Sequence, residues 1–307
     1  MLGQMVIHKR MKLSLTLLLL AASVPGLAEI DLSGGWAALN PDDILLLADY
    51  TGIPFNDAGR AKGLSYSQSQ LSEPERVCVL YTQVQLFAGP FGLKISKQTD
   101  AGGKIAAWVL GGWEDRAPMT MWMDGRAQES KYGPHDRSGF TTGRWDGDVL
   151  VSTTTHMKTG YIRRNGAEHS DQAVLTIRYL RHGDLLTLAA TLIDPIYLSE
   201  PLYWTRTFRH TNGDVAQLEG PCVQGDEGVQ EGVVPHFLPG QNPFLDEMNK
   251  EFHIPVIASQ GGAETMYPEF RKKIKDAFTP VEKCLHCGRN NGGGPPPGPG
   301  PGGGPPE

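Results

Sequence analysis

Apolar and polar positions alternate through the middle of the chain, and this alternation predicts β-strands. Two neighbouring stretches read as hairpins, with turns at residues 146–148 and 182–184. Residues 175–179 place an apolar side chain at every second position on the way into the second turn, and residues 186–192 do so on the way out. A period of two puts alternate side chains on one face of a strand. Residues 139–211 are therefore predicted to form an antiparallel meander.

Similar runs occur upstream, at residues 77–82, 93–95, 105–110 and 119–123, and glycine-rich pairs mark turns between them. Together with the meander they predict roughly eight to ten strands at hairpin spacing. This number favours an antiparallel β fold and excludes a doubly wound α/β fold. We expect a mainly β protein, either an up-and-down barrel of the lipocalin type or a sandwich, with a few peripheral helices.

Helical patterns flank the strands. A helix is predicted from Pro41 to Ala48 after an Asn40 cap, a second over 243–252 with Asn242 as its cap, and a third from Pro268 to Phe278. The resulting organisation is a signal peptide over 1–28, a β domain over 29–222, a helical extension over 223–283 packed on the β domain, and a tail over 284–307. That tail combines a Cys-x-x-Cys with Gly and Pro, and we expect it to be disordered.

The first residues predict export. Basic residues precede an apolar run over 13–24, and small residues stand before a cut after Ala28. The run is shorter than the roughly 20 residues that span a bilayer, so we expect a soluble periplasmic or extracellular protein. Cleavage removes three basic residues and no acid from 28 basic and 34 acidic ones, which leaves 25 against 34 and a formal charge of −9. This sign argues against nucleic acid and anionic membranes as partners.

The four cysteines form a distant and a close pair. In an oxidising compartment, Cys78 and Cys222 are predicted to form a disulfide between an early strand and the end of the meander. Cys284 and Cys287 could bind a soft metal such as Cu(I) or close into a small disulfide. Copper also has thioether candidates in Met119, Met121 and Met123, which alternate on one strand face, although such a stripe also suits a core.

Two resemblances bear on the fold. The Gly34-Gly35-Trp36 segment resembles the opening of lipocalin-type barrels. Residues 143–151, Gly-Arg-Trp-Asp-Gly-Asp-Val-Leu-Val, resemble the core of a family of exported bacterial proteins, mostly of unassigned function. The likeness continues through Thr-His-Met-Lys at 155–158, Arg-Arg-Asn-Gly at 163–166 and His-Ser-Asp at 169–171. Many relatives have a His where Phe140 stands here. The resemblance implies one domain over 31–278 and does not imply a particular reaction.

Chemistry-bearing residues gather between the two hairpins. No Gly-x-Ser-x-Gly occurs, and His169, Ser170 and Asp171 are adjacent, which does not suit a triad because neighbours on a strand point to opposite faces. A divalent metal could be held by His156 and His169 with Asp171 as ligand or orienting group, although no fixed metal-binding spacing occurs. Three other histidines could join them: His135, His182 and His210. His182 also suits a solvated turn.

The function we expect is binding of a small ligand at a barrel mouth. The polar groups would be His156, Lys158, Arg163, His169, Asp171 and Arg126, and the wall would be Trp108, Trp122 and Trp145. Paired arginines suit carboxylate binding, although the basic residues could instead form salt bridges with Asp146, Asp148, Glu168 and Asp171. One alternative is a metal-dependent hydrolase or related enzyme using His156, His169 and Asp171. Another is a structural or interaction module of the envelope.

Overall fold

A computed structural model describes residues 30–39, 48–66, 77–79, 81–84, 92–111, 118–212 and 234–277. The predicted signal peptide, most of the predicted helix over 41–48, and the tail from 284 onward lie outside these residues. Cys222, Cys284 and Cys287 lie outside them too. Cys78 is disulfide-bonded, and its pairing with Cys222 stays a prediction.

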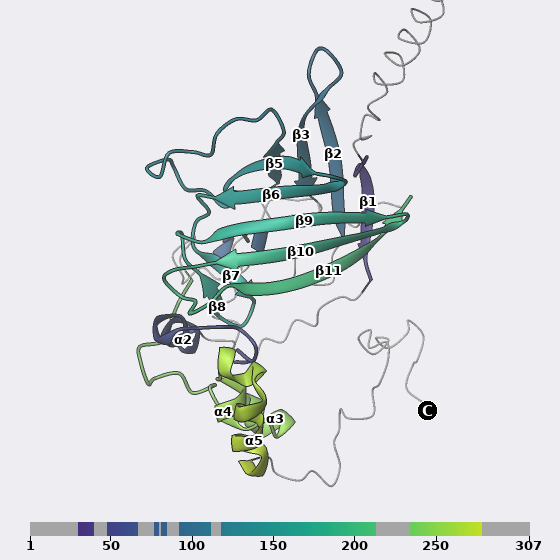
Figure 1. Cartoon of the computed structure of the whole chain (residues 1–307). Helices are drawn as coiled ribbons and strands as arrows, with labels where there is room; N and C mark the ends of the chain where they lie inside the picture. Colours follow the sequence, from purple (N-terminus) through teal and green to yellow (C-terminus); the bar gives the residue numbers. More distant parts are fainter. Residues whose placement is uncertain are drawn as a thin grey trace, which may run out of the picture.

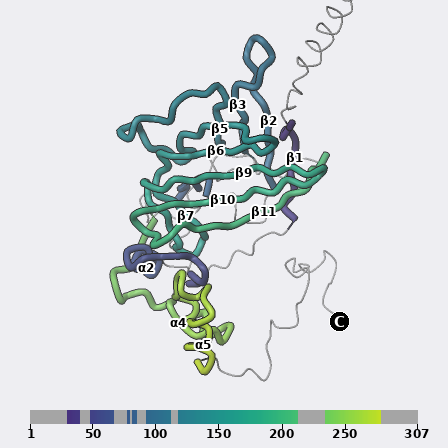
Figure 2. The backbone as a smooth tube through the Cα atoms, viewed as in Figure 1, coloured from purple at the N-terminus to yellow at the C-terminus, as the bar shows by residue number. Residues whose placement is uncertain are grey.

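Nine strands close into a barrel, which confirms the mainly β prediction and decides for a barrel over a sandwich. The strand order is β1-β11-β10-β9-β6-β5-β4-β3-β2, and Figure 2 shows β5, β6, β9, β10 and β11 side by side. β4 and β5 run parallel, so the barrel departs from a strict up-and-down plan. The strands are β1 Gly34–Ala38, β2 Leu93–Thr99, β3 Ile105–Gly111, β4 Met119–Trp122, β5 Phe140–Asp146, β6 Val149–Thr155, β9 Val174–His182, β10 Leu185–Ile193 and β11 Leu202–Thr211.

Both predicted hairpins are present, and both use the same turn. Asp146 pairs with Val149 across the first turn, and His182 pairs with Leu185 across the second, so each loop has two residues. The first loop residue is a glycine at positive φ, 64° for Gly147 and 59° for the second turn. Glycine at this position matches the right-handed twist of the flanking strands. Together with the β2–β3 turn, these loops form what we call the hairpin end of the barrel.

The opposite end, which we call the crossing end, is built differently. Between β6 and β9 the chain leaves the barrel and forms a separate two-stranded sheet of β7 (Gly160–Arg163) and β8 (Ala167–His169). The connection from β10 to β11, residues 194–201, lies at the same end. The alternation over 77–82 predicts a strand, but residues 77–79 form a turn with Cys78 at φ 54°. No described residue of 77–84 belongs to a barrel strand.

The core lies inside the barrel and continues through the crossing end. Side chains that point inward from the strands, such as Trp36, Trp108 and Phe208, are almost completely buried. The same apolar cluster includes Ile162 and Ala167 from β7 and β8, together with apolar residues from 48–55. The mouth at the crossing end is therefore covered by apolar side chains among the described residues.

The helices lie beyond the crossing end (Figure 1). They are α2 (Asp57–Leu64), α3 (Glu247–Phe252), α4 (Val256–Ser259), α5 (Pro268–Ile274) and two 3₁₀ turns, Ala263–Met266 and Lys275–Ala277. The predicted start at Pro268 is confirmed. The predicted start at Pro243 is wrong, because α3 begins at Glu247 with Asp246 at the N-cap position, although Asn242 Oδ1 accepts from the Phe244 amide at 3.0 Å. The side-chain Nδ2 of Asn242 donates to the carbonyls of Leu64 and Tyr66 and so ties the extension to α2.

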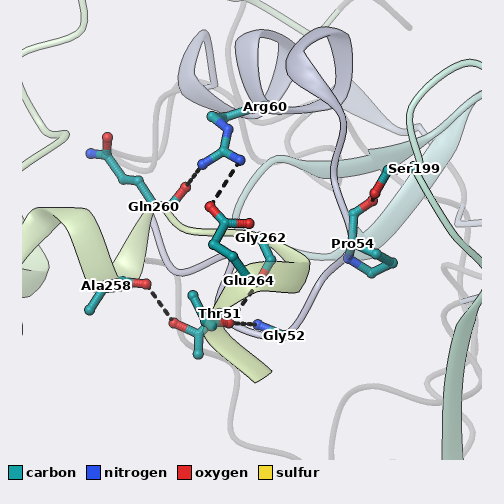
Figure 3. A network of polar contacts seen from close by, with 10 residues as sticks. Thr51, Gly52, Pro54, Arg60, Ser199, Ala258, Gln260, Gly262 and Glu264 are labelled. Atoms are coloured by element: carbon teal, nitrogen blue, oxygen red, sulfur yellow. Dashed lines mark hydrogen bonds and ion pairs between the residues drawn. The ribbon is translucent and has the colours of Figure 1, made fainter. Parts of the chain in front are cut away.

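Polar contacts attach the C-terminal extension to residues 48–66 (Figure 3). Arg60 donates to the carbonyl of Gln260 at 2.6 Å, and Thr51 donates to that of Ala258 at 3.1 Å. The Gly52 amide donates to a threonine hydroxyl of the extension at 2.8 Å. The extension therefore joins the barrel by way of α2 and its flanks. No helix in the described ranges is long and apolar enough to cross a membrane.

Candidate functional site

The structure does not gather the predicted ligand-binding residues around one hollow. Lys158 and Asp171 are exposed. Arg126 is also exposed, where it pairs with Asp124 and lies 3.7 Å from the centre of the Trp122 ring. The prediction relied on strand pairing to bring these side chains together. The long loop that joins the parallel strands β4 and β5 instead holds Arg126 on the outer surface.

Two other predicted residues also lie apart. Arg163 is half-buried at the end of β7, and Trp145 packs against the barrel core. His182 is exposed at its hairpin turn, as expected for a turn residue. His210 packs edge-on against Trp36, with ring centres 5.1 Å apart.

His156 anchors a loop. It has a positive φ of 56°, its Nε2 donates to the Ser130 carbonyl at 2.8 Å, and its Nδ1 lies 2.8 Å from the Thr155 hydroxyl. The neighbouring His135 donates to the Met157 carbonyl at 3.1 Å. These contacts hold the loop 123–139 along β5 and β6, and they occupy both ring nitrogens of His156.

His169 belongs to a buried network of its own. Its Nδ1 donates to the Ser170 carbonyl at 2.9 Å, which leaves Nε2 to accept from the Thr82 hydroxyl at 2.7 Å. Ser170 in turn donates twice to Asp194, at 2.6 and 2.7 Å. Burial lowers the pKa of His169 to about 4, so the ring is neutral. The hydroxyl and imidazole have the arrangement of a nucleophile and its base, but Thr82 and His169 are both completely buried. The network is structural.

These contacts also bear on the predicted metal site. Both nitrogens of His156 and of His169 are already bonded to protein groups. Within the described part of the chain, no three His, Cys, Asp or Glu side chains converge where they could hold a metal ion. The alternative with His156, His169 and Asp171 as metal ligands therefore has no geometric support.

The crossing end holds a different polar cluster, which we call the Glu168 site. Glu168 on β8 is almost buried, with 4% of its side chain exposed. Its Oε2 lies 3.7 Å from Lys62 Nζ on α2, and its Oε1 lies 3.6 Å from Nε2 of His236, in the segment before α3. Lys62 and His236 are 35% and 23% exposed. Three elements distant in sequence thus meet at one carboxyl group.

Burial controls the ionisation of this site. It raises the pKa of Glu168 from 4.5 to about 7, although Lys62, Tyr161 and Arg137 oppose the shift. Burial also lowers the pKa of His236 to about 4, with the charge of Lys62 adding to the effect. At neutral pH the site therefore holds a half-protonated carboxyl and a neutral imidazole. Environments that push two pKa values apart in this way are typical of proton-handling sites.

The hydrogen bonds around His236 fix its tautomer. The Ser65 hydroxyl donates to the Lys62 carbonyl at 2.6 Å, so its oxygen accepts the bond from His236 Nδ1 at 2.9 Å. The proton of the neutral ring is therefore on Nδ1, and Nε2 presents a lone pair toward Glu168. Sequence reasoning named Glu168 only as a possible salt-bridge partner of other cations, and it named neither Lys62 nor His236. Their meeting depends on contacts between residues 68 to 171 positions apart, which leave no local pattern.

Inside the barrel, a second group of polar side chains lies in register. Pairing across β5, β6, β9, β10 and β11 places five inward residues in one row, namely Trp145, Leu150, Tyr179, Leu188 and Arg206. The Ser152 hydroxyl donates to that of Tyr179 at 3.4 Å. On the other side of the barrel, Trp108 pairs with Met121. The row thus carries an indole, a phenol and a guanidinium into a mostly apolar interior.

Two indole N–H groups in this interior are buried without an acceptor. The Nε1 atoms of Trp108 and Trp145 have no hydrogen-bond partner in the described structure, whereas Nε1 of Trp36 donates to the Leu32 carbonyl at 3.0 Å. Trp108 is completely buried. Buried polar groups are nearly always bonded in folded proteins, so each of these donors calls for an acceptor.

An open pocket of about 300 Å³ lies at the hairpin end, outside the barrel. Asp31 and Lys97 line it and pair with each other at 2.7 Å. This pairing lowers the pKa of Asp31 to about 2. Because the two charges satisfy each other, they offer a ligand little to bind.

No family model and no curated protein matches the sequence. Among solved structures, secretory abundant heat soluble protein 4 from Ramazzottius varieornatus is similar to this chain, with 13% identity and a TM-score of 0.27. The match covers 59% of this chain and 94% of that one. A likeness of this size carries no argument about function.

Proposed function

We propose that the protein binds a small ligand inside its barrel. The observation that carries the proposal is the pair of buried indole N–H groups, on Trp108 and Trp145, that lack an acceptor in the described structure. Leaving a buried donor unbonded costs about 1–3 kcal/mol. A ligand oxygen placed within reach of these donors would recover that energy on binding.

Water is a poor substitute at Trp108. A buried water needs two to four polar partners, but the inward neighbour of Trp108 on β4 is Met121. The next residue in that row, Thr141, already exchanges a hydrogen bond with Thr154 at 2.8 Å. A bound molecule that brings its own acceptor therefore suits this place better than an isolated water.

The interior also indicates the chemistry of the ligand. Its inward residues are mostly apolar, such as Met119, Leu150 and Ile177, which are completely buried. The polar groups of the row are hydrogen-bond donors. We therefore propose an apolar molecule that carries a carbonyl or carboxylate oxygen, with its apolar body against the core residues.

Export remains part of the proposal. It is supported by the predicted signal in residues 1–28 and by the disulfide at Cys78, because disulfides persist in oxidising compartments. The resemblance to exported bacterial proteins around residues 143–171 points the same way. Peptide mapping of the unreduced protein tests the pairing, and a Cys78 peptide linked to a partner other than Cys222 would refute it.

The decisive experiment is a fluorescence titration of the mature chain with cis-parinaric acid, an apolar carboxylate whose emission rises on burial. Trp108→Phe and Trp145→Phe remove the N–H groups and keep an aromatic ring. We expect each to weaken binding about 5- to 30-fold, because one hydrogen bond to a buried donor is lost. The control is Trp122→Phe, since Arg126 stacks on Trp122 at the outer surface.

Circular dichroism of each variant establishes that it is folded before its affinity is compared. Absence of binding to the wild-type chain would contradict the proposal. So would equal affinities in all three variants, because the indole N–H groups would then play no part. Native mass spectrometry of the purified protein adds the identity of any molecule that remains bound.

A further inference from the structure

We infer that Lys62, Glu168 and His236 form a second ligand site at the crossing end, and that this site binds a small carboxylate. The site lies outside the barrel interior and shares no residue with the row of Trp145 and Arg206. It therefore stands or falls independently of ligand binding in the barrel.

The arrangement presents an ammonium and an imidazole to the solvent, and the acid lies beneath them. Lys62 and His236 are 35% and 23% exposed, whereas the Glu168 side chain is 4% exposed. A ligand that approaches from solution meets the ammonium and the imidazole first. The distances of 3.7 and 3.6 Å from these groups to Glu168 exceed a normal hydrogen bond. Lys62 can therefore turn to another acceptor, and Nε2 of His236 can do so once it is protonated.

The charges facing Glu168 favour an anion. Lys62 on α2 and Arg137 from the loop before β5 act on it as cations, and Arg137 is held by a bond of 2.6 Å to the Thr159 carbonyl. Glu168 itself carries only part of a charge near neutral pH, since burial raises its pKa to about 7. Other titratable groups border the site, namely Tyr161 on β7, His169 on β8, Tyr50, Tyr197 from the β10–β11 connection, and the carboxylates Asp49, Asp171 and Asp194. The charge effects printed for Glu168 itself come from Lys62 and Arg137, and both are cations.

The geometry also suits the two oxygens of a carboxylate. Lys62 Nζ and His236 Nε2 already face the two separate oxygens of one carboxyl group, that of Glu168. A ligand carboxylate can accept from Lys62 with one oxygen and from His236 with the other. The second bond requires a proton on Nε2, because the neutral ring holds its proton on Nδ1 against Ser65. That proton comes from solution, so binding takes up one proton at the imidazole.

The test uses sodium acetate as the probe, titrated into the full mature chain at pH 6.5 with sodium chloride holding the ionic strength constant. Nitrogen NMR of the His236 ring reports both binding and protonation. We expect the acetate-saturated protein to show His236 protonated at Nε2. Lys62→Met should weaken acetate binding at least about tenfold, because a charge-assisted bond is lost.

Two further variants make the proposal sharp. Glu168→Gln removes the negative charge beneath the ligand and should tighten acetate binding several-fold. Lys250→Met is the matched control, because Lys250 pairs with Asp246 on the exposed face of the extension, and it should leave the affinity unchanged.

Three results would overturn the inference. One is a His236 resonance that responds equally to acetate and to chloride. Another is an unchanged acetate affinity in folded Lys62→Met protein. The third is weaker binding in Glu168→Gln. None of these three results affects the titration with parinaric acid. Failure of this site can therefore be distinguished from failure of the barrel site.

Discussion

The two ends of the barrel are closed in different ways. At the hairpin end, adjacent strands join through tight turns whose residues are neighbours in sequence, and the distant pair Asp31 and Lys97 is added to them. At the crossing end, β7 and β8, α2 and the segment around His236 converge from positions up to 174 residues apart, as Lys62 and His236 show. The hairpin end is governed by local geometry, whereas the crossing end depends on many specific long-range contacts.

This difference predicts how the two ends tolerate the same substitution. Gly183 at the hairpin end has φ +59°, and an added Cβ there would meet no atom within 4 Å. Gly166 at the crossing end has φ +86°, and an added Cβ would lie 2.4 Å from Cβ of Tyr66. We expect Gly166→Ala to destabilise the fold by about 3 kcal/mol or more, because backbone strain and overpacking add together. Urea unfolding measures this loss as a change in the free energy of unfolding.

Gly183→Ala serves as the matched comparison. It has the backbone cost alone, about 1 kcal/mol. Equal losses of stability in the two variants would show that the crossing end can rearrange around a methyl group, and the contrast between the two ends would then fail.

Local patterns in the sequence were sufficient for most strands and for the mainly β class, and they left barrel and sandwich both open. The alternation over 175–192 determines which side chains point inward, and the glycines at 147 and 183 determine the turns, so the strands and the register follow from neighbours in sequence. Pro268 marks the start of α5 for a similar reason. Val77 to Val79 alternate in the same way, but that segment lies outside the barrel strands, where Cys78 is disulfide-bonded and takes a positive φ.

The candidate sites were less accessible to sequence reasoning. Trp108 and Trp145 point inward, and this direction follows from the strand period. The polar residues of the 156–171 crossing were expected to face one another, but His156 and His169 bond to different loops. Glu168 acquires its partners from α2 and from the extension, and no period or motif relates residues so far apart.

The buried carboxyl at the crossing end makes the stability of the fold depend on pH. An unfolded chain releases the Glu168 proton near pH 4.5, whereas the folded chain keeps it to about pH 7. The ionised carboxylate therefore lowers the free energy of unfolding progressively as the pH rises from 4.5 through 7. We expect Glu168→Gln to match the wild type at pH 4 and to exceed it by up to about 3 kcal/mol at pH 8.

Urea unfolding at both pH values measures this difference, and the exposed Glu269→Gln provides the control. His236 and His169, whose pKa values are lowered to about 4, act in the opposite direction below pH 6.5 and are present in all three proteins. A Glu168→Gln variant that is no more stable than the wild type at pH 8 would mean that Lys62 and Arg137 fully compensate the buried charge.

The smallest effect is expected inside the barrel, where a polar pair lies between neighbouring strands. Thr141 and Thr154 share one hydrogen bond of 2.8 Å and are both buried. Thr141→Val leaves the other hydroxyl without this partner in the core and should cost about 1 kcal/mol. Replacing both threonines by valine removes donor and acceptor together and should restore stability to within about 0.5 kcal/mol of the wild type. Thermal unfolding of the single and double variants measures these differences in stability. The double variant could instead lose as much stability as the two single variants lose together. That result would show that this pair of strand positions depends on its particular polar contacts, as the crossing end does.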